Sequence, residues 1–232
     1  KRAASVGDGI LKFSDTEVEH YEKYYNKKSG IKKIIKFVPA SGAASRMFKE
    51  LFAFLENNDI DGNKAAQVFI KGLKDFAFYE QLASRLTAKG ANIDESFEGN
   101  NYAVIVEELL SSEGMDYGSL PKGLLKFHKY GDKTRTPVEE HFIEGASYAV
   151  SSGNNVNLHF TVSPEHQLKF EQHVEEVKSF YEQLAGVTFN VSFSQQKKST
   201  DTIAVDMQNK PFLDGEEILF RPAGHGALLA NL

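Results

Sequence analysis

The chain of 232 residues contains no cysteine, and this absence excludes several kinds of chemistry. Disulfide bonds, thiolate nucleophiles and cysteine-ligated zinc are all ruled out. Long apolar runs are missing too: none approaches the ~20 residues that a membrane-spanning helix needs, so we expect no membrane span. Residues 1–9 lack the apolar stretch of a signal peptide, and position 1 is Lys. We therefore predict a cytoplasmic protein, and we do not expect Lys1 to be its native start.

The chain also lacks an excess of positive charge. Its formal net charge is −5 and its sequence pI is near 5.8, so the composition does not favour nucleic acid as a partner. Basic pairs such as Lys27-Lys28 and Lys32-Lys33 are typical of solvated faces, and any bound anion must be held locally by loops. By contrast, 41% hydrophobic and 12% aromatic residues suffice for a packed core, in one domain or in a core domain with an insertion.

Strands alternate with helices along most of the chain. Apolar segments with the length and pattern of strands lie at residues 34–38, 156–162 and 187–193, and the first is expected to be buried. Residues 124–128 are predicted to form a short strand or an extended segment. Helices are predicted near residues 15–25, 45–55, 136–151 and 163–185. One helix opens with Thr136-Pro137-Val138-Glu139, which combines a capping box with proline at the first helical position, and Gly186 ends another. This alternation predicts an α/β fold with a mainly parallel sheet flanked by helices.

A helical stretch interrupts this alternation. From Lys64 to about Ser112 the apolar residues recur at helical spacing, and we interpret the region as an all-helical insertion. The predicted division is an N-terminal helical segment at 1–33, an α/β core at 34–58 and 118–232, and the insertion at 59–117. We expect the core to be truncated, because an apolar helix has only just begun at Ala227 when the chain ends.

Two segments on either side of the predicted insertion carry the candidate chemistry. Ser41-Gly42-Ala43-Ala44-Ser45-Arg46 follows a predicted strand and precedes a helix, a junction that can direct backbone N–H groups at a phosphate. Pro121-Lys122-Gly123 supplies a lysine. Taken alone, the first segment is better explained as a tight turn with Ser45 as helix cap and Arg46 on the surface. It is not a Walker loop, because no Gly-Lys-Ser/Thr follows.

Together with three later segments, these motifs resemble the split signature of sugar-nucleotide pyrophosphorylases, which are nucleotidyltransferases of the GT-A-like fold. Their loop is glycine-rich and is followed by Arg and then by Pro-Lys-Gly-Leu. The UDP-sugar pyrophosphorylase branch is the most similar, through His159–Ser163 with His166, Phe193–Gln195 and Arg221–Gly226. The ordered series covers roughly residues 34–232. Within this superfamily the sequence is most similar to a divergent bacterial group whose biochemical role is undefined.

The resemblance implies transfer of a nucleotidyl group from a nucleoside triphosphate, with UTP favoured, to a sugar 1-phosphate with release of pyrophosphate. It implies catalytic roles for Arg46, on the leaving pyrophosphate, and for Lys122, on the α-phosphate. The implied nucleotide contacts are Ser41, Gly42, Ala43, Ala44, Ser45, Gln195, Gly224, His225 and Gly226. Mg²⁺ is expected as the usual partner of such phosphates, but its protein ligands are unknown.

Departures from the family pattern favour an alternative. Ser41 and Ala44 replace glycines that are common in the loop, which predicts less room beside the phosphates. The aspartate that would bind a metal after the Gly224-His225-Gly226 loop does not occur in this chain. The alternative is a non-catalytic nucleotide-binding or nucleotide-sensing domain on the same fold. A helical scaffold that binds no small ligand is a third hypothesis.

Other charged groups are predicted to be structural. Glu139-Glu140-His141 does not favour a metal site, because adjacent helix positions do not share a face, and Glu139 fits the capping box. His166 and His173 are expected at an interface or on the surface. Arg135 and Lys197-Lys198 are expected to be solvated.

Overall fold

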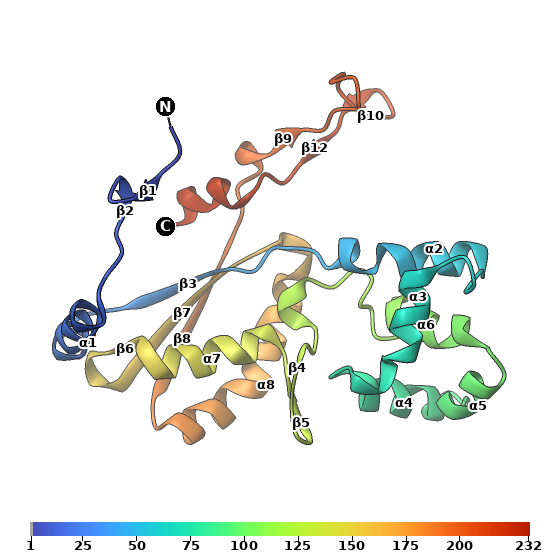
Figure 1. The fold of residues 1–232 in the computed structure, drawn as a ribbon, viewed down its shortest axis with the longest axis horizontal. Coiled ribbons are helices and arrows are strands. Elements are labelled where there is room, and N and C mark those ends of the chain that lie inside the picture. Colours follow the sequence, from blue (N-terminus) through green and yellow to red (C-terminus); the bar gives the residue numbers. More distant parts are fainter. Residues whose placement is uncertain (1) are drawn as a thin grey trace.

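The computed structural model describes residues 2–232, apart from the side chain of His225. In this structure the chain forms two packed units with two extensions (Figure 1). An α/β unit contains a parallel sheet and two long helices, and a helical unit lies beside it. An N-terminal segment and a C-terminal ribbon of short strands extend from the α/β unit. Among the described residues, no helix is long and apolar enough to cross a membrane.

The sheet of the α/β unit is mainly parallel. Strand β7 (Asn155–Val162) is central, with β3 (Ile35–Pro39) on one edge and β8 (Thr188–Gln195) on the other, both parallel to it. The short strand β6 (Val150–Ser151) pairs antiparallel with the start of β7. Helices link these strands, so the predicted α/β class, with a parallel sheet flanked by helices, is confirmed.

Helices α7 (Pro137–Tyr148) and α8 (Gln167–Ala185) cover one face of the sheet. The reason is the period of two along β7, where alternate side chains point to opposite faces. One face carries apolar residues that are buried against the two helices: Val156, Leu158, Phe160 and Val162. The opposite face carries Asn157, His159 and Thr161, which bond polar groups of neighbouring strands. Within residues 2–232 the long helices therefore pack on a single face.

Local end signals in the sequence form as predicted. Thr136 caps α7: its hydroxyl accepts from the Glu139 N–H at 3.3 Å, and its own N–H donates to Glu139 Oε2 at 2.7 Å. Gly186 ends α8 in the left-handed conformation at φ 66°. One expectation is wrong: the strand near 34–38 is not buried. It is the edge strand β3, in which Val38 is buried but Ile35 is 55% exposed, because β7 pairs with only one side of it.

The helical unit has its own hydrophobic core. Its helices are α2 (Lys49–Asn57), α3 (Lys64–Lys71), α4 (Tyr79–Ala88), α5 (Ile93–Glu98) and α6 (Tyr102–Leu110). Leu73, Leu82 and Ile105 are fully buried at its centre. Helix α2 also packs here through Leu51 and Phe54, although its sequence position places it before the predicted insertion. The helical core therefore draws on residues outside 59–117.

The remaining elements are short. The segment 124–128, expected to be extended, starts with the end of a 3₁₀ turn at Lys122–Leu124, and a strand begins only at His128. The other helix is α1 (Asp15–Ser29), and the other strands are β1 (Ser5–Val6), β2 (Gly9–Ile10), β4 (His128–Tyr130), β5 (Lys133–Arg135), β9 (Thr202–Ile203), β10 (Leu213–Asp214), β11 (Glu217–Ile218) and β12 (Phe220–Arg221). A 3₁₀ segment, His225–Asn231, follows β12.

A buried carboxylate ties α6 to α4 in the helical unit. The Glu108 side chain is 4% exposed and lies 2.6 Å from Arg85 Nε and 2.5 Å from Lys89 Nζ. Burial by itself would raise the pKa of this carboxyl, but hydrogen bonds and attraction from Lys89 and Arg85 outweigh it and hold the pKa below its ordinary value. Glu108 therefore stabilises the fold in its ionised form.

We predict that Glu108→Gln lowers the free energy of unfolding at neutral pH by about 1–3 kcal/mol, because it weakens two charge-assisted hydrogen bonds in a buried place. Since the folded pKa is depressed, this stabilisation is present above the ordinary pKa of 4.5 and is lost as the pH falls through the lower folded value. Urea unfolding at pH 7 and pH 3 measures the effect. The exposed neighbour Glu107→Gln is the control, and an equal effect at both pH values would contradict the prediction.

Candidate functional site

The parallel strands end at a common edge, and the predicted site residues follow these ends. Pro39 pairs with Thr161, and Val162 pairs with Gln195, so the carboxyl ends of β3, β7 and β8 are level. The Ala40 N–H continues this register by donating to Thr161 O at 2.8 Å. Ligands of open α/β sheets bind beyond the carboxyl ends of the strands. This edge is therefore the candidate functional site.

The two segments that flank the helical unit lie side by side at this edge. Ala43 and Pro121 form an isolated antiparallel bridge. Its two hydrogen bonds run from Lys122 N to Gly42 O at 3.0 Å and from Ala44 N to Leu120 O at 3.2 Å. The chain leaves the α/β unit through one segment and returns through the other. The structure thus brings together two predicted site segments that are far apart in the sequence.

The first segment presents free backbone donors. Within residues 2–232, the N–H groups of Ser41, Gly42 and Ala43 donate to no protein acceptor. Gly42 and Ala43 are exposed. A Cβ atom built on Gly42 would have no heavy atom within 4 Å, so neither its packing nor its φ requires glycine. Such a row of exposed amides beside open space suits an anion.

Ala44 and Ser45 differ from their predicted roles. Ala44 is fully buried in the helical core, and its N–H donates to the carbonyl oxygen of Leu120. It therefore anchors the loop, and its methyl group takes no room from a ligand. Ser45 is exposed and makes no capping hydrogen bond; the residue before the 3₁₀ turn Ser45–Phe48 is Ala44, and α2 follows Phe48. The expectation that Ser45 caps a helix is therefore wrong.

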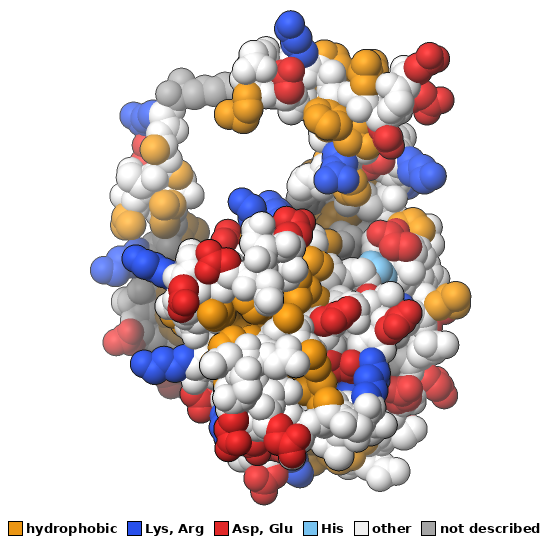
Figure 2. Space-filling model, turned by 90° about the vertical axis from the view of Figure 1, so that its right-hand side faces the viewer, with side chains coloured by type: hydrophobic (Ala, Val, Ile, Leu, Met, Phe, Trp, Pro, Cys, Tyr) orange, Lys and Arg blue, Asp and Glu red, His pale blue; other side chains and the backbone are white. Residues whose placement is uncertain are grey.

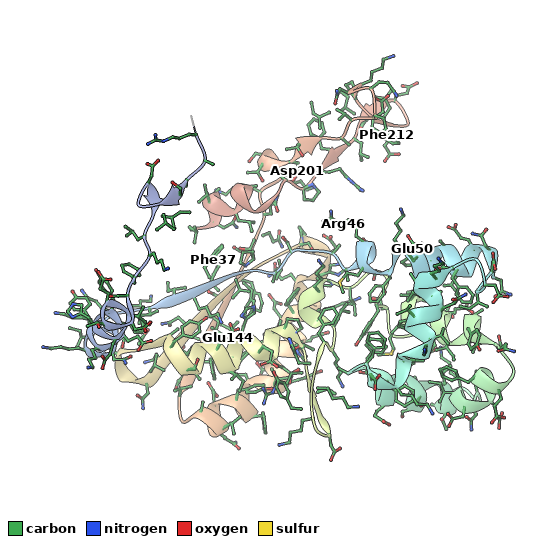
Figure 3. The ribbon with its side chains drawn as sticks, viewed as in Figure 1. Phe37, Arg46, Glu50, Glu144, Asp201 and Phe212 are labelled. Atoms are coloured by element: carbon green, nitrogen blue, oxygen red, sulfur yellow. The ribbon has the colours of Figure 1, made fainter. Side chains whose placement is uncertain are left out.

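Two basic side chains flank this loop. Lys122 and Arg46 are exposed, and neither has an acidic partner within 4.0 Å in the part of the chain that the structure describes. Figure 3 shows Arg46 pointing away from α7 and Glu144. The neighbouring helical unit is rich in acidic side chains, which are scattered over its outer face in Figure 2. The loop therefore carries two basic side chains that are free to meet an anion.

The backbone of Lys122 is held by packing on both sides. Pro121 is buried, and a Cβ atom on Gly123 would lie 3.0 Å from the ring of Phe170 on α8. Lys169, the preceding residue of α8, lies 2.6 Å from Asp116. Asp116 in turn accepts the Leu120 N–H at 3.0 Å through its carbonyl oxygen. The turn that carries Lys122 is therefore bonded to both units.

A second pair of predicted segments meets at the end of β8. Asn231 Nδ2 donates to Gln195 O at 2.8 Å, and Gln196 Nε2 donates to Ala223 O at 3.3 Å. These contacts hold the segment that contains Gly224 and Gly226 beside Gln195. Both glycines are exposed, and a Cβ atom placed on either would have no heavy atom within 4 Å. The predicted contact from the side chain of His225 lies outside the described residues.

Polar groups that lie between the loop at residues 41–43 and the end of β8 were not among the predicted nucleotide contacts, although Ser163 and His166 belong to a quoted motif. Ser163 follows β7 directly, and its buried Oγ has no hydrogen-bond partner among the described residues; the same holds for Nδ1 of His166. Gln167, at the start of α8, accepts from Gln195 Nε2 at 2.7 Å. The signal that points to these residues is their position just after a parallel strand, at the edge where ligands bind.

Several of the charged groups predicted to be structural have protein partners, and Arg135, which was expected to be solvated, is partly buried beside Glu140. Glu139 caps α7, while Glu140 lies 3.4 Å from Arg135 and His141 lies 3.2 Å from Glu144. His173 Nε2 is 2.8 Å from Thr136 Oγ1, and burial lowers the pKa of this histidine below its ordinary value.

The residues at the edge do not fit a metal ion held by the protein. The described side chains of the predicted site residues offer only hydroxyl, amide, ammonium and guanidinium groups, whereas Mg²⁺ prefers carboxylate and phosphate oxygens. Among residues 2–232, no group of three or more His, Asp or Glu side chains is arranged to hold a metal ion. The site is therefore a candidate for anion binding through its own donors.

Two glycines of the site, Gly42 and Gly123, are predicted to differ in how much a substitution lowers stability. We predict that Gly42→Ala leaves the melting temperature nearly unchanged, because the added methyl group meets open space. Gly123→Ala should cost about 1–3 kcal/mol of stability, because its methyl group presses on the ring of Phe170. Thermal unfolding of both variants beside the unmutated protein checks this. A Gly42→Ala variant less stable than Gly123→Ala would contradict the geometry.

Comparison with known proteins identifies a family but no activity. The chain matches the family model described as "Domain of unknown function (DUF4301)" over residues 1–232. The comparison with curated proteins found no match, and the comparison with solved structures found none either. Because the family match spans residues 1–232, the protein belongs to the DUF4301 family.

Proposed function

We propose that this protein is a nucleotidyltransferase of the GT-A-like fold, which binds a nucleoside triphosphate at the carboxyl edge of its sheet. It transfers the nucleotidyl group to a sugar 1-phosphate and releases pyrophosphate, with UTP as the favoured donor. The single observation that carries the proposal is the pairing of residues 41–43 with Pro121 and Lys122. This pairing sets free amides beside an exposed lysine at the edge where α/β sheets bind ligands.

The phosphate half of the proposed site is built from the loop and two basic residues. The free N–H groups of Ser41, Gly42 and Ala43 are suited to phosphate oxygens. Lys122 supplies a point charge for the α-phosphate, and the guanidinium of Arg46 suits bidentate contact with the leaving pyrophosphate. Because neither side chain has an acidic partner among the described residues, both charges are available to a ligand.

The base half is proposed at the end of β8. Gln195 and the open glycines Gly224 and Gly226 lie together there, and exposed glycine backbone allows a flat base to approach closely. The strands run β3, β7 and β8 in chain order across the sheet, as in one half of a nucleotide-binding α/β sheet. The ends of β3 and β8 are two strand spacings apart, or about 10 Å. A nucleotide lying across the end of β7 would reach both halves.

The proposed chemistry needs mainly position and positive charge. An oxygen of the sugar 1-phosphate attacks the α-phosphorus, the bond from that phosphorus to the β-phosphate oxygen breaks, and pyrophosphate leaves. Lys122 and Arg46 neutralise charge on the transferred and leaving groups, respectively. Mg²⁺ would arrive on the phosphate oxygens of the triphosphate and supply further charge neutralisation. The predicted site residues supply no carboxylate for it, and the described residues hold no cluster of three or more potential metal ligands, so no step is assigned to a metal held by the protein.

We predict that Lys122→Ala reduces pyrophosphate release by about 100-fold and that Arg46→Ala reduces it by about 10-fold or more, because each removes a charge aimed at the reacting phosphates. The measurement is pyrophosphate release with UTP, the other nucleoside triphosphates and a panel of sugar 1-phosphates. Lys129→Ala, an exposed lysine on β4, is the control and should have little effect. An equal loss in the control would contradict the assignment, as would absence of both turnover and a nucleotide-dependent thermal shift.

Nucleotide binding without turnover is the second candidate. It is favoured by the predicted site residues, since those that the structure describes include no carboxylate to serve as a base or a metal ligand. Under this alternative the thermal shift with UTP is retained and is weakened by Lys122→Ala, while no pyrophosphate appears with any sugar 1-phosphate. The two measurements together separate the candidates.

A further inference from the structure

A chain of three polar side chains ends at Gln195. Gln195 Nε2 donates to Gln167 Oε1 at 2.7 Å, and Gln167 Nε2 donates to Glu171 Oε1 at 2.7 Å. Gln167 and Glu171 are four residues apart on α8, so their side chains share one face of the helix. Gln195 is exposed, whereas the other two are partly buried. We name this chain the Glu171–Gln167–Gln195 relay.

The relay has one direction because it begins at a carboxylate. An ionised carboxylate can only accept hydrogen bonds, so Gln167 must turn its NH₂ group toward Glu171. The side-chain oxygen of Gln167 then faces Gln195, so Gln195 must donate a hydrogen bond from its own NH₂ group. The donor-to-acceptor direction of both hydrogen bonds is therefore fixed by the Glu171 carboxylate, although either amide alone could point either way.

The consequence lies at the free end of the relay. Because one N–H of its NH₂ group donates to Gln167, the Gln195 amide is held in one orientation, with Oε1 as the open acceptor on its other side. Its backbone is held as well, because Asn231 donates to Gln195 O at 2.8 Å. An amide held in this way favours a ligand group that donates a hydrogen bond and disfavours one that only accepts.

We infer that Gln167 and Glu171 are positioning residues that make Gln195 select nucleobases with a ring N–H at the edge they present, as in uracil, over bases with a ring lone pair there, as in cytosine. This inference rests on the proposed nucleotide site. It adds a physical basis for base selection that the motifs do not contain. Neither Gln167 nor Glu171 contacts the base; they act by holding one amide in one orientation.

The test compares UTP and CTP, which differ in whether N3 of the ring carries a proton. We expect the unmutated protein to bind UTP about tenfold or more tightly than CTP, by isothermal titration. Glu171→Gln removes the acceptor-only group, so that a chain of three amides can run in either direction. The ratio of UTP to CTP affinity should then fall toward one, while the melting temperature stays close to that of the unmutated protein.

A double variant with the two side chains exchanged tests whether the effect of Glu171→Gln comes from the direction of the relay or from a loss of structure. In Gln167→Glu combined with Glu171→Gln, the carboxylate moves to position 167, still accepts from Gln195 and restores the direction of the relay without a change in net charge. The preference for UTP should return. Glu175→Gln, an exposed acid one turn further along α8, is the matched control and should leave the ratio unchanged.

The outcomes distinguish this inference from the proposed function. If the unmutated protein binds neither nucleotide, the nucleotide site and the relay's role in base selection both fall. If it binds UTP and CTP equally, or if Glu171→Gln leaves their affinity ratio unchanged, the relay inference fails while the nucleotide site stands. Failure of the swapped variant to recover the preference, although it folds, would also overturn the relay inference.

Discussion

The bridge between Ala43 and Pro121 is the contact on which the rest of the arrangement depends. The chain crosses between two hydrophobic cores at this point, once outward and once back. Ala44 and Leu125 are buried in the helical core, while Ala40 is buried in the core of the α/β unit. The loop and the lysine turn are therefore held from both sides. Without the bridge, residues 41–43 would have no partner that holds them beside Lys122.

The same bridge explains why one backbone donor of the loop remains free. In an antiparallel pair, hydrogen bonds alternate with positions where backbone groups point away from the partner strand. Ala43 occupies such a position, and its neighbour across the bridge is a proline, which has no N–H. The free N–H of Ala43 thus follows from the pairing geometry. At the end of β8 the relay from Glu171 directs the side-chain NH₂ group of Gln195 toward Gln167. The side-chain oxygen Oε1 of Gln195 is therefore left free to accept a hydrogen bond.

Much of the fold could be predicted because its signals are local. Alternating residues in β7, the capping box at Thr136 and the left-handed glycine at 186 each act within a few residues. The exposure of β3 and the anchoring of Ala44 could not be predicted in this way. They depend on which partner packs against a residue, and that partner is distant in the sequence. The prediction for Ser45 is wrong because the helix that it was expected to cap begins one 3₁₀ turn later.

The sequence by itself determined the chemical groups and the order of the elements: a small-residue loop after a strand, a lysine between proline and glycine, and a glutamine at a strand end. It determined the family as well, since the match extends over residues 1–232. Only the tertiary structure decided which of these groups meet. Hydrogen bonds between segments that are remote in the chain set the loop beside Lys122 and gave the Gln195 amide a direction, because such bonds form only once packing has brought both partners together.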